Sequence, residues 1–404
     1  MRTRSGVFAA AAIGFAFILA CPGFALAQTV EELFENNTIQ EIRLSVNSRD
    51  LAKLRQTYQL NTYYPADLTW KSVKVRNVGI RSRGTGSRSA TKPGFRIDFD
   101  RYTTGQKFVG LSTVVLDNIW QDDAMIREKL AFTFFERLGQ PAPRESYCRL
   151  FINNEYQGLY TITEEIDGAF ARRVTGETDG TVFEFHADNA RPFRAEDLGD
   201  IANYKPNFEP RTHVLDADTT LYTPIQQLFR EANGPDDAVW RSRVEEYLDL
   251  NSFMIHVGIE QFIAGNDGLL GVFGMNNFYL YRYNGSQKHR VFVWDQDQAF
   301  IVPPESGIAN SDANIIFQRA MTYPDLRDAY LKAIEDCAIL SRTDDWLLNE
   351  IDRLAGIIFD AARADTKKQF DNQQFDEAVN WLRGFAARRP NIVLAEVARL
   401  RNGS

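Results

Sequence analysis

The chain has 404 residues, of which 44% are hydrophobic and 25% charged, and its formal net charge at pH 7 is −8. A chain of this size and composition can bury one large core or two lobes, and it indicates neither disorder nor a repeat array. The acidic balance argues against nonspecific nucleic-acid binding, which depends on basic patches that release counterions.

The N-terminus has the pattern of a secretory signal peptide. Arg2 and Arg4 precede an apolar run over 7–20, and the small-residue site Ala-Leu-Ala ends at Ala27. We predict cleavage after Ala27, which makes 1–27 the signal peptide and the mature protein secreted or periplasmic. Cys21 offers a lipoprotein signal as an alternative. Beyond this segment, no run reaches about 18 apolar residues, so no membrane span is predicted in the mature protein.

The mature chain keeps two cysteines, Cys148 and Cys337. They allow one disulfide in an oxidising compartment, or they are two small buried hydrophobic residues. The chain has no CxxC or HExxH pattern and its four histidines are scattered. The sequence therefore does not predict a zinc site.

In chain order, the first elements are a strand over 41–46 and a helix from Asp50, its expected cap, to 58. A second strand over 71–82 leads into the glycine-rich segment GTGSRSATKPG. Gly84 and Gly86 allow backbone amides to approach a ligand. The side chains of Arg81, Arg83, Arg88 and Lys92 add positive charge, which suits phosphates. The GxGxxS spacing also fits a glycine turn with solvated basic residues.

Return strands are predicted over 95–99 and 110–118. An amphipathic helix follows, with Asp122 or Asp123 as its cap, Glu128 in its first two turns and Gly139 at its end. A hairpin is predicted over 146–166, and a short helix over 167–173.

The stretch over 251–300 contains the polar residues with the clearest chemistry. A buried helix that starts near Asn251 and ends by Gly265 would place Asp267 on the following loop. The runs 276–283 and 289–294 then predict a hairpin.

Asp295 and Asp297 leave the second strand of that hairpin, and alternation would aim both carboxylates the same way. Such a pair repels unless a cation lies between them, so a divalent metal site is predicted. Asn and Asp at turns also serve backbone hydrogen bonds, which is the structural alternative. Period-3.6 apolar positions predict a mostly helical C-terminal third.

Several ordered segments together resemble the spore coat protein H (CotH) kinase family over roughly 38–400. They are GIRSRGTGS, TKPGFRIDF, GQKFVGL, IREKLAFTFFERLGQPAP, FINNEYQGLYTITEEID, NNFYLY and VWDQDQAF. The resemblance implies an α+β, atypical protein-kinase-like two-lobed fold, with a β-rich N-lobe over 28–167 and a mostly helical C-lobe over 168–404. It also implies a Ser/Thr kinase that uses ATP with Mg²⁺ or Mn²⁺ and acts on an exported protein substrate.

By the same resemblance, Asp267 is the expected catalytic base. Asn277, or its neighbour Asn276, is an expected metal ligand, with Asp295 as the main metal-binding aspartate and Asp297 as a further ligand. Residues expected near the nucleotide are Arg83, Gly84, Lys92 (with Lys107 as runner-up), Glu128 as partner of the lysine, and Glu164 near the adenine.

The sequence departs from ordinary kinases in three ways. No HRD precedes the loop, Asp267 and Asn277 are ten residues apart, and Asp295-Gln296-Asp297 replaces DFG. Glu184 stands where some relatives have lysine, which leaves open a changed nucleotide preference or a changed reaction such as adenylylation or glutamylation. The remaining alternative is a non-catalytic envelope or surface assembly protein that retains the fold.

Overall fold

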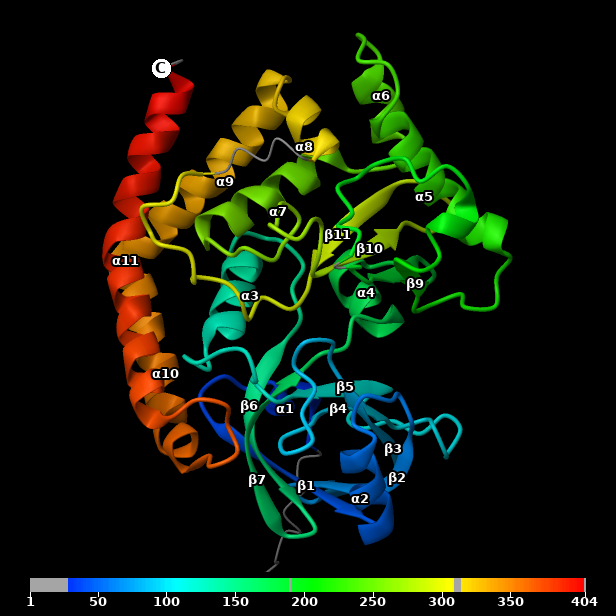
Figure 1. The fold of residues 1–404 in the computed structure, drawn as a ribbon, viewed down its shortest axis with the longest axis vertical. Coiled ribbons are helices and arrows are strands. Elements are labelled where there is room, and N and C mark those ends of the chain that lie inside the picture. Colours follow the sequence, from blue (N-terminus) through cyan, green and yellow to red (C-terminus); the bar gives the residue numbers. More distant parts are fainter. Residues whose placement is uncertain (1–27, 189, 309–313, 403–404) are drawn as a thin grey trace, which may run out of the picture.

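The computed structural model describes residues 28–188, 190–308 and 314–402. The predicted signal peptide lies outside these residues. Within them the protein is an α+β mixture, with a β-barrel followed by a mostly helical region that contains a small sheet (Figure 1).

The first part of the described chain forms a closed barrel of seven strands in the order β1-β2-β3-β4-β5-β7-β6. Hydrogen bonds between β1 and β6, which run parallel, close the barrel. Side chains along β1 alternate between buried and more exposed positions, as a strand with one face in a core requires. Large aromatic side chains, among them Trp70, Phe95 and Tyr160, fill the interior. The strands are β1 (Ile39–Val46), β2 (Tyr64–Trp70), β3 (Val73–Arg83), β4 (Gly94–Asp98), β5 (Thr113–Asp117), β6 (Glu145–Ile152) and β7 (Glu155–Thr163), with the helices α1 (Val30–Leu33) and α2 (Ser48–Gln56) beside them.

Helix α3 (Arg127–Arg137) lies between β5 and β6 in sequence, yet its buried face joins the core of the helical region. Phe134 contacts Phe262 and Trp346 with ring-centroid distances of 5.2 and 5.1 Å. The predicted cap at Asp122 or Asp123 is wrong, because the N-cap position is Ile126. Asp122 nevertheless accepts a hydrogen bond of 2.7 Å from the backbone N–H of Arg127.

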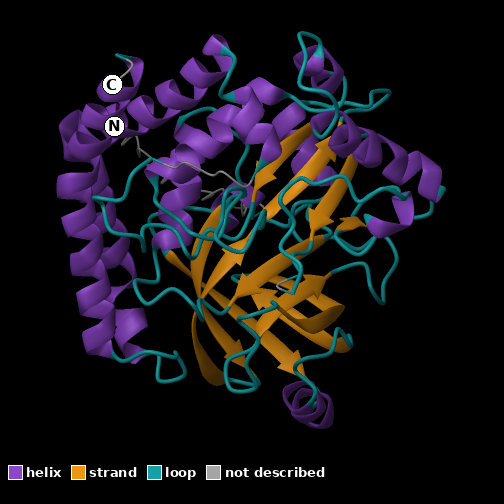
Figure 2. Ribbon diagram, turned by 45° about the horizontal axis from the view of Figure 1, so that its top comes forward, coloured by secondary structure: helices purple, strands orange, loops and turns teal. Residues whose placement is uncertain are grey.

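A four-stranded sheet in the order β11-β10-β8-β9 lies among the helices. The hairpin of β10 and β11 was predicted and is confirmed. Figure 2 shows helices on the outside of this region and the strands toward the middle of the molecule. The strands are β8 (Thr181–Phe185), β9 (Phe208–Pro210), β10 (Phe278–Arg282) and β11 (His289–Val293); the helices are α4 (Gly168–Thr175), α5 (Asp218–Ala232), α6 (Trp240–Glu245), α7 (Leu250–Phe262), α8 (Ile315–Ala320), α9 (Pro324–Arg342), α10 (Trp346–Ala364) and α11 (Asn372–Arg401), with short 3₁₀ turns at Ile201–Asn203 and Thr343–Asp345.

Two further predicted caps are wrong by one or a few residues. Helix α7 is capped by Asp249, which accepts from the backbone N–H of Ser252, and not by Asn251. Helix α2 is capped by Asn47, and Asp50 lies in its first turn. In both cases a neighbouring Asp or Asn could accept the same bond, and local pattern alone does not choose between them.

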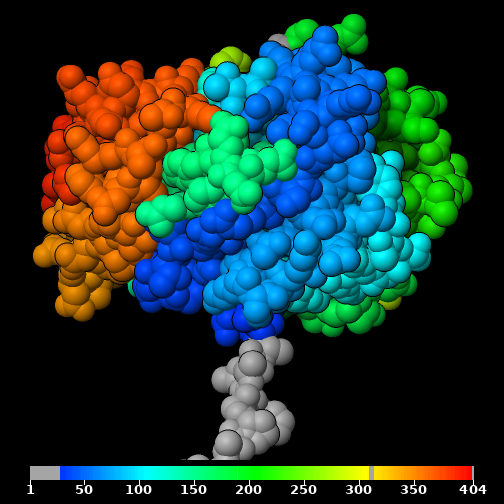
Figure 3. Space-filling view, turned by 90° about the horizontal axis from the view of Figure 1, so that it is seen from below, coloured from blue at the N-terminus to red at the C-terminus, as the bar shows by residue number. Residues whose placement is uncertain are grey.

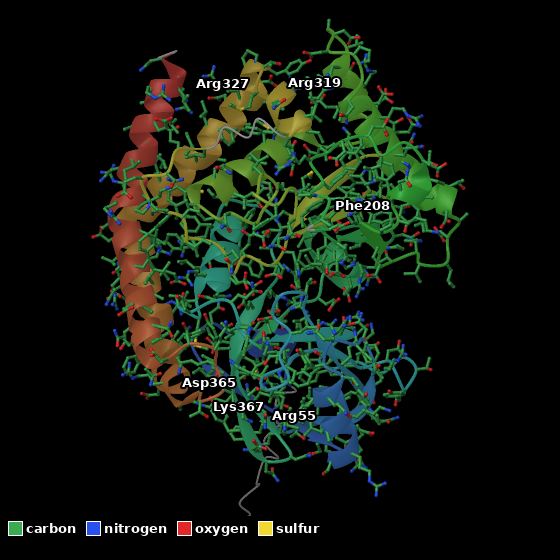
Figure 4. The ribbon with its side chains drawn as sticks, in the orientation of Figure 1. Arg55, Phe208, Arg319, Arg327, Asp365 and Lys367 are labelled. Carbon is green, nitrogen blue, oxygen red and sulfur yellow. The ribbon has the colours of Figure 1, made fainter. Side chains whose placement is uncertain are left out.

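The helices α10 and α11 run along one side of the molecule and reach the barrel (Figure 1). From below, α10 and α11 lie next to the barrel, with the β6–β7 hairpin beside them (Figure 3). The loop after α10 brings Asp365 onto β7, where its carboxylate accepts from the backbone N–H of Leu159 at 3.0 Å. Nearby, Lys367 pairs with Glu155 at 2.8 Å (Figure 4).

The two cysteines are free thiols in separate cores. Cys148 lies in the barrel interior and Cys337 in the core of the helical region, and both are fully buried. Burial raises the pKa of both thiols. Of the two sequence alternatives, the structure shows two small buried residues.

None of the helices over 28–188, 190–308 and 314–402 combines the length and apolar character needed to cross a membrane.

Candidate functional site

Five acidic side chains meet where the barrel joins the helical region, and we call them the acidic cluster. Two come from the N-terminal half and three from loops of the helical region. Their proximity is seen in their mutual electrostatic influence and in two small pockets, one lined by Asp267 and Asp295 and the other by Asp117, Glu128 and Asp297. The cluster consists of Asp117 at the end of β5, Glu128 in the first turn of α3, Asp267 after α7, and Asp295 and Asp297 after β11.

Asp267 lies on the loop after α7, as predicted, and two asparagines hold it. Its Oδ1 accepts a hydrogen bond of 2.9 Å from Asn276, and its Oδ2 accepts one of 3.1 Å from Asn277. The amide of Asn277 also donates to the backbone carbonyl of Asp267 at 2.9 Å. Burial raises the pKa of Asp267, and the two asparagine hydrogen bonds oppose that rise. The structure thus brings together the predicted base and the predicted asparagines.

Asp295 follows the end of β11 with a φ of +48°, the left-handed region that few residues other than glycine adopt. The predicted strand alternation from Asp295 to Asp297 is therefore wrong, because β11 ends at Val293. Backbone strain of this kind is common at functional sites, where surrounding structure holds it in place.

Asp295 and Asp297 both lie among other carboxylates. The pKa of Asp295 is raised to about 6, mainly by burial and also by the charges of Asp117 and Asp267, while Arg83 opposes the rise. Burial and then Asp295 raise the pKa of Asp297 well above its usual value. Carboxylates that are hard to ionise together are what a divalent cation would neutralise.

Arg83 reaches the cluster from the end of β3. Its guanidinium forms a 2.9 Å ion pair with Asp117 and lies 5.6 Å from the ring centroid of Trp294. The next residue, Gly84, has a φ of +104°, and a Cβ there would lie 2.4 Å from the Ser87 hydroxyl. The turn therefore requires glycine at this position.

The same turn carries two arginines that form no ion pair with a described carboxylate. Arg81 and Arg88 both donate to the side-chain oxygen of Asn61, at 3.0 and 2.5 Å. Burial, and then the neighbouring charges of Arg81 and Arg83, lower the pKa of Arg88. A set of like charges around a glycine turn favours a bound anion.

Three of the residues expected near the nucleotide make no ion pair with the acidic cluster. The Lys92 ammonium, fully buried, lies 2.8 Å from Asp365. Glu164 pairs with Arg144 at 2.8 Å and with Arg173 at 2.5 Å. The runner-up, Lys107, is exposed on the loop after β4. Their nucleotide roles remain predictions that this arrangement does not favour.

Glu128 does reach the cluster, but it does not pair with Lys92. Burial raises its pKa well above the usual value, and Glu145 and Asp295 raise it further. No ion pair of Glu128 occurs within the part of the chain that the structure describes.

Sequence reasoning missed Asp117 and Glu145. Glu145 begins β6 with 1% of its surface exposed, and neither of its carboxylate oxygens makes a hydrogen bond. The pKa of Glu145 is raised to about 8, mainly by burial, while the charge of Lys129 opposes the rise. The available signal was an acidic residue at the end of an apolar strand, as in TVVLD for Asp117.

The acidic cluster has the ligand chemistry of a hard divalent cation. Among the described residues, no three of its carboxylates have ligand oxygens within 4.8 Å of one another. Such spacing suits Mg²⁺, which keeps several waters and takes one or two carboxylates together with phosphate oxygens.

Comparison with known proteins gives two kinds of match. A family model described as CotH kinase protein matches residues 80–393, which include the glycine turn and the whole acidic cluster. Inner spore coat protein H of Bacillus subtilis (strain 168) is 24% identical over 258 residues, which cover 63% of this chain and 67% of that protein. An inner spore coat protein H-like protein of the same strain is 32% identical over 71 residues, which cover 18% of this chain and 22% of that protein. The family match spans more than half of the chain, and the chain therefore belongs to the CotH kinase protein family.

Proposed function

We propose that this protein is an exported protein kinase with a kinase-like two-lobed fold, which transfers the γ-phosphate of ATP to a Ser or Thr hydroxyl of an exported protein. The observation that carries the proposal is the position of Asp267, held by Asn276 and Asn277 within the same acidic cluster as Asp295. Phosphoryl transfer needs an oriented carboxylate near the acceptor hydroxyl and oxygen ligands for a divalent metal.

In this proposal Asp267 accepts the proton of the acceptor hydroxyl. The hydrogen bonds from Asn276 and Asn277 fix the orientation of its carboxylate. A raised pKa makes the carboxylate a better proton acceptor.

The metal would be Mg²⁺ or Mn²⁺, held by Asp295, Asp297 and the side-chain oxygen of Asn277. When bound, it supplies positive charge next to the nucleotide phosphates. The excess of buried carboxylates fits such an ion. The glycine turn at Gly84 carries Arg81 and Arg88, which provide the positive charge for the phosphates.

The comparisons support export only by name, since the two relatives are described as inner spore coat protein H and an H-like protein. The predicted signal peptide points the same way. We therefore place the acceptor among exported proteins.

The test uses residues 28–404 with ATP, Mg²⁺ or Mn²⁺ and a serine-rich acceptor protein, followed by intact-mass measurement of both proteins. We expect a phosphate adduct. Asp267→Ala should lower turnover by about 10²- to 10⁴-fold with nucleotide binding retained. Asp295→Ala should abolish metal-dependent nucleotide binding.

Asp328→Ala on the exposed surface of α9 is the matched control and should behave as wild type. Full transfer activity in both site variants would contradict the assignment. A nucleotide adduct in place of phosphate would show a transferase of the adenylylating kind, for which the glutamate at position 184 leaves room.

One observation favours a second candidate function, a non-catalytic assembly or binding protein. Lys92, the best sequence candidate for a phosphate-binding lysine, is held in a buried ion pair with Asp365. The absence of any adduct, together with the absence of an ATP-dependent shift in melting temperature, would favour this second function.

A further inference from the structure

Three metal-ligating side chains converge at the edge of the small sheet, outside the residues assigned to the kinase reaction. They are Glu184, His186 and Glu209, which we call the β8–β9 triad. One potential ligand atom from each lies within 4.8 Å of the other two. Among the described residues, no other group of three His, Cys, Asp or Glu side chains brings its ligand atoms within 4.8 Å of one another.

The backbone fixes the geometry of the β8–β9 triad. Glu184 and Glu209 are direct cross-strand partners in the antiparallel pair of β8 and β9. His186 stands two residues after Glu184, and hydrogen bonds to Asn207 anchor its backbone on both sides: its N–H donates to the Asn207 carbonyl at 2.7 Å, and its carbonyl accepts from the Asn207 amide at 2.8 Å. The three side chains are thus presented by two paired strands and not by a long loop.

The two glutamates of the triad share one close arginine, Arg211. Like charges directly opposite each other in a sheet repel. Arg211 lies 3.5 Å from both glutamates, but its short contact, 2.9 Å, is with Glu165. Glu165 is only 6% exposed, and its second carboxylate oxygen has no hydrogen-bond partner. Glu165 also pairs with Arg96 at 3.2 Å, so Arg211 is shared among three carboxylates. Glu184 has no hydrogen bond of its own among the described residues.

We propose that Glu184, His186 and Glu209 bind one divalent transition-metal ion, Zn²⁺ or Mn²⁺, without any need for nucleotide. One imidazole and two carboxylates are ligands that these ions accept. The separation of the ligand atoms fits a single ion, because metal–ligand bonds of about 2.0–2.4 Å place two ligands no more than about 4.8 Å apart.

The remaining coordination positions face solvent. The side chains of His186 and Glu209 are 42% and 53% exposed, so water completes the shell. His186 and Glu209 now lie 2.8 Å apart, Nε2 to Oε2, and the ion replaces the proton between them. The sequence could not show this site by motif spacing, because Glu209 is 23 residues from His186.

The site is distinct from the acidic cluster but electrostatically coupled to it. The charge of Glu184 is felt at Asp295. An ion in the triad therefore also weakens the negative field at the acidic cluster, although the proposal does not rest on kinase activity.

The test is metal binding by residues 28–404 stripped with EDTA, in the background Asp295→Ala, so that the acidic cluster does not contribute its own ion. Zn²⁺ and Mn²⁺ are titrated separately without nucleotide by calorimetry, and bound metal is counted after dialysis. We expect one ion per chain. His186→Ala and Glu209→Gln should each weaken binding by at least about tenfold, the smaller end of the loss seen when support of a metal ligand is removed.

The matched control is His213→Ala, because His213 also lies near two carboxylates, Asp179 at 3.3 Å and Asp216 at 3.6 Å, without forming a converging triad. It should bind metal as the background protein does. Co²⁺ provides a second readout, since its visible absorption reports an imidazole-containing site and should be lost in His186→Ala. Unchanged affinity in both triad variants, or no binding of either metal by the background protein, would overturn the proposal and leave the proposed kinase function untouched.

Discussion

Two regions of this protein bury charged side chains, and they differ in whether those charges have partners. In the first, Lys92 and Asp365 form a 2.8 Å ion pair whose side chains are both fully buried. Asp365 also accepts hydrogen bonds from the backbone N–H groups of Leu159 and Lys367. In the second, the acidic cluster, one of the five carboxylates, Asp117, forms an ion pair with Arg83, and the other four form none among the described residues.

The presence or absence of partners for the buried charges suggests a different role for each region. A buried charge with a partner and several hydrogen bonds fixes one arrangement of the chain, here the attachment of the α10–α11 loop to the barrel. Buried like charges without partners destabilise the fold and are retained where a ligand completes them. The comparison therefore supports an architectural role for the Lys92–Asp365 pair and fits the metal site proposed at the acidic cluster.

The largest effect should come from breaking the compensated pair. Asp365→Ala leaves the Lys92 ammonium buried without a partner and removes the acceptor for the Leu159 N–H. We expect the free energy of unfolding to fall by about 3–5 kcal/mol, measured by urea denaturation.

Two variants control that experiment. Asp376→Ala removes an exposed ion pair with Arg363 and should cost less than about 1 kcal/mol. Adding Lys92→Met to Asp365→Ala should recover part of the loss, because no unpaired charge then remains. A loss below about 1 kcal/mol for Asp365→Ala would contradict an architectural role for the Lys92–Asp365 pair.

The second effect concerns pH and the acidic cluster. The pKa of Asp295 is raised to about 6 in the folded state. Between pH 4 and 6 the folded protein therefore binds more protons at this group than the unfolded chain, and stability falls as pH rises through that window. In EDTA, Asp295→Asn should be more stable than wild type by on the order of 1–2 kcal/mol at pH 8, with the difference vanishing toward pH 4.

The informative quantity is the difference in the free energy of unfolding between Asp295→Asn and the wild-type protein at each pH. Burial lowers the pKa of His289 to about 3, so this group alone makes stability rise with pH up to its unfolded value, and subtraction cancels it. Urea unfolding at several pH values provides the measurement. A difference that does not grow between pH 4 and 6 would show that Asp295 is already compensated.

The smallest effect tests whether Glu128 behaves as an uncompensated carboxylate of the acidic cluster. If it lies among uncompensated carboxylates, Glu128→Gln should raise the melting temperature in EDTA, corresponding to a gain of about 1 kcal/mol. If it is instead the partner of a lysine, the same variant should lower the melting temperature. Addition of Mg²⁺ should reduce the gain, because the cation then performs the neutralisation.

Sequence patterns located most of the elements and half of the site. Period-2 alternation identified β3, and apolar period 3.6 identified α10 and α11, because both signals depend on neighbours in the chain. The barrel strand β2 was not predicted. The same local reasoning placed Asp267 on a loop after a buried helix, where the structure has it. It missed the cap Asp249 because several acceptors stood within two residues.

Sequence reasoning did not anticipate contacts between residues that lie far apart in the chain. Lys92 follows a glycine turn rich in arginine, which favours a phosphate role, but its partner Asp365 comes from the other end of the protein. Glu145 gave only the weak local signal of an acidic residue at the end of an apolar strand, because its neighbours Asp117, Glu128 and Lys129 come from other elements.

The sequence alone determined the α+β composition, the hairpins, the positive charge of the glycine turn and, through resemblance, the family to which the chain belongs. Only the tertiary structure decided which charges are compensated, because a side chain's ionisation depends on burial and on partners that the fold brings close. For the same reason the β8–β9 triad became visible only when Glu209 was placed opposite Glu184 in the sheet.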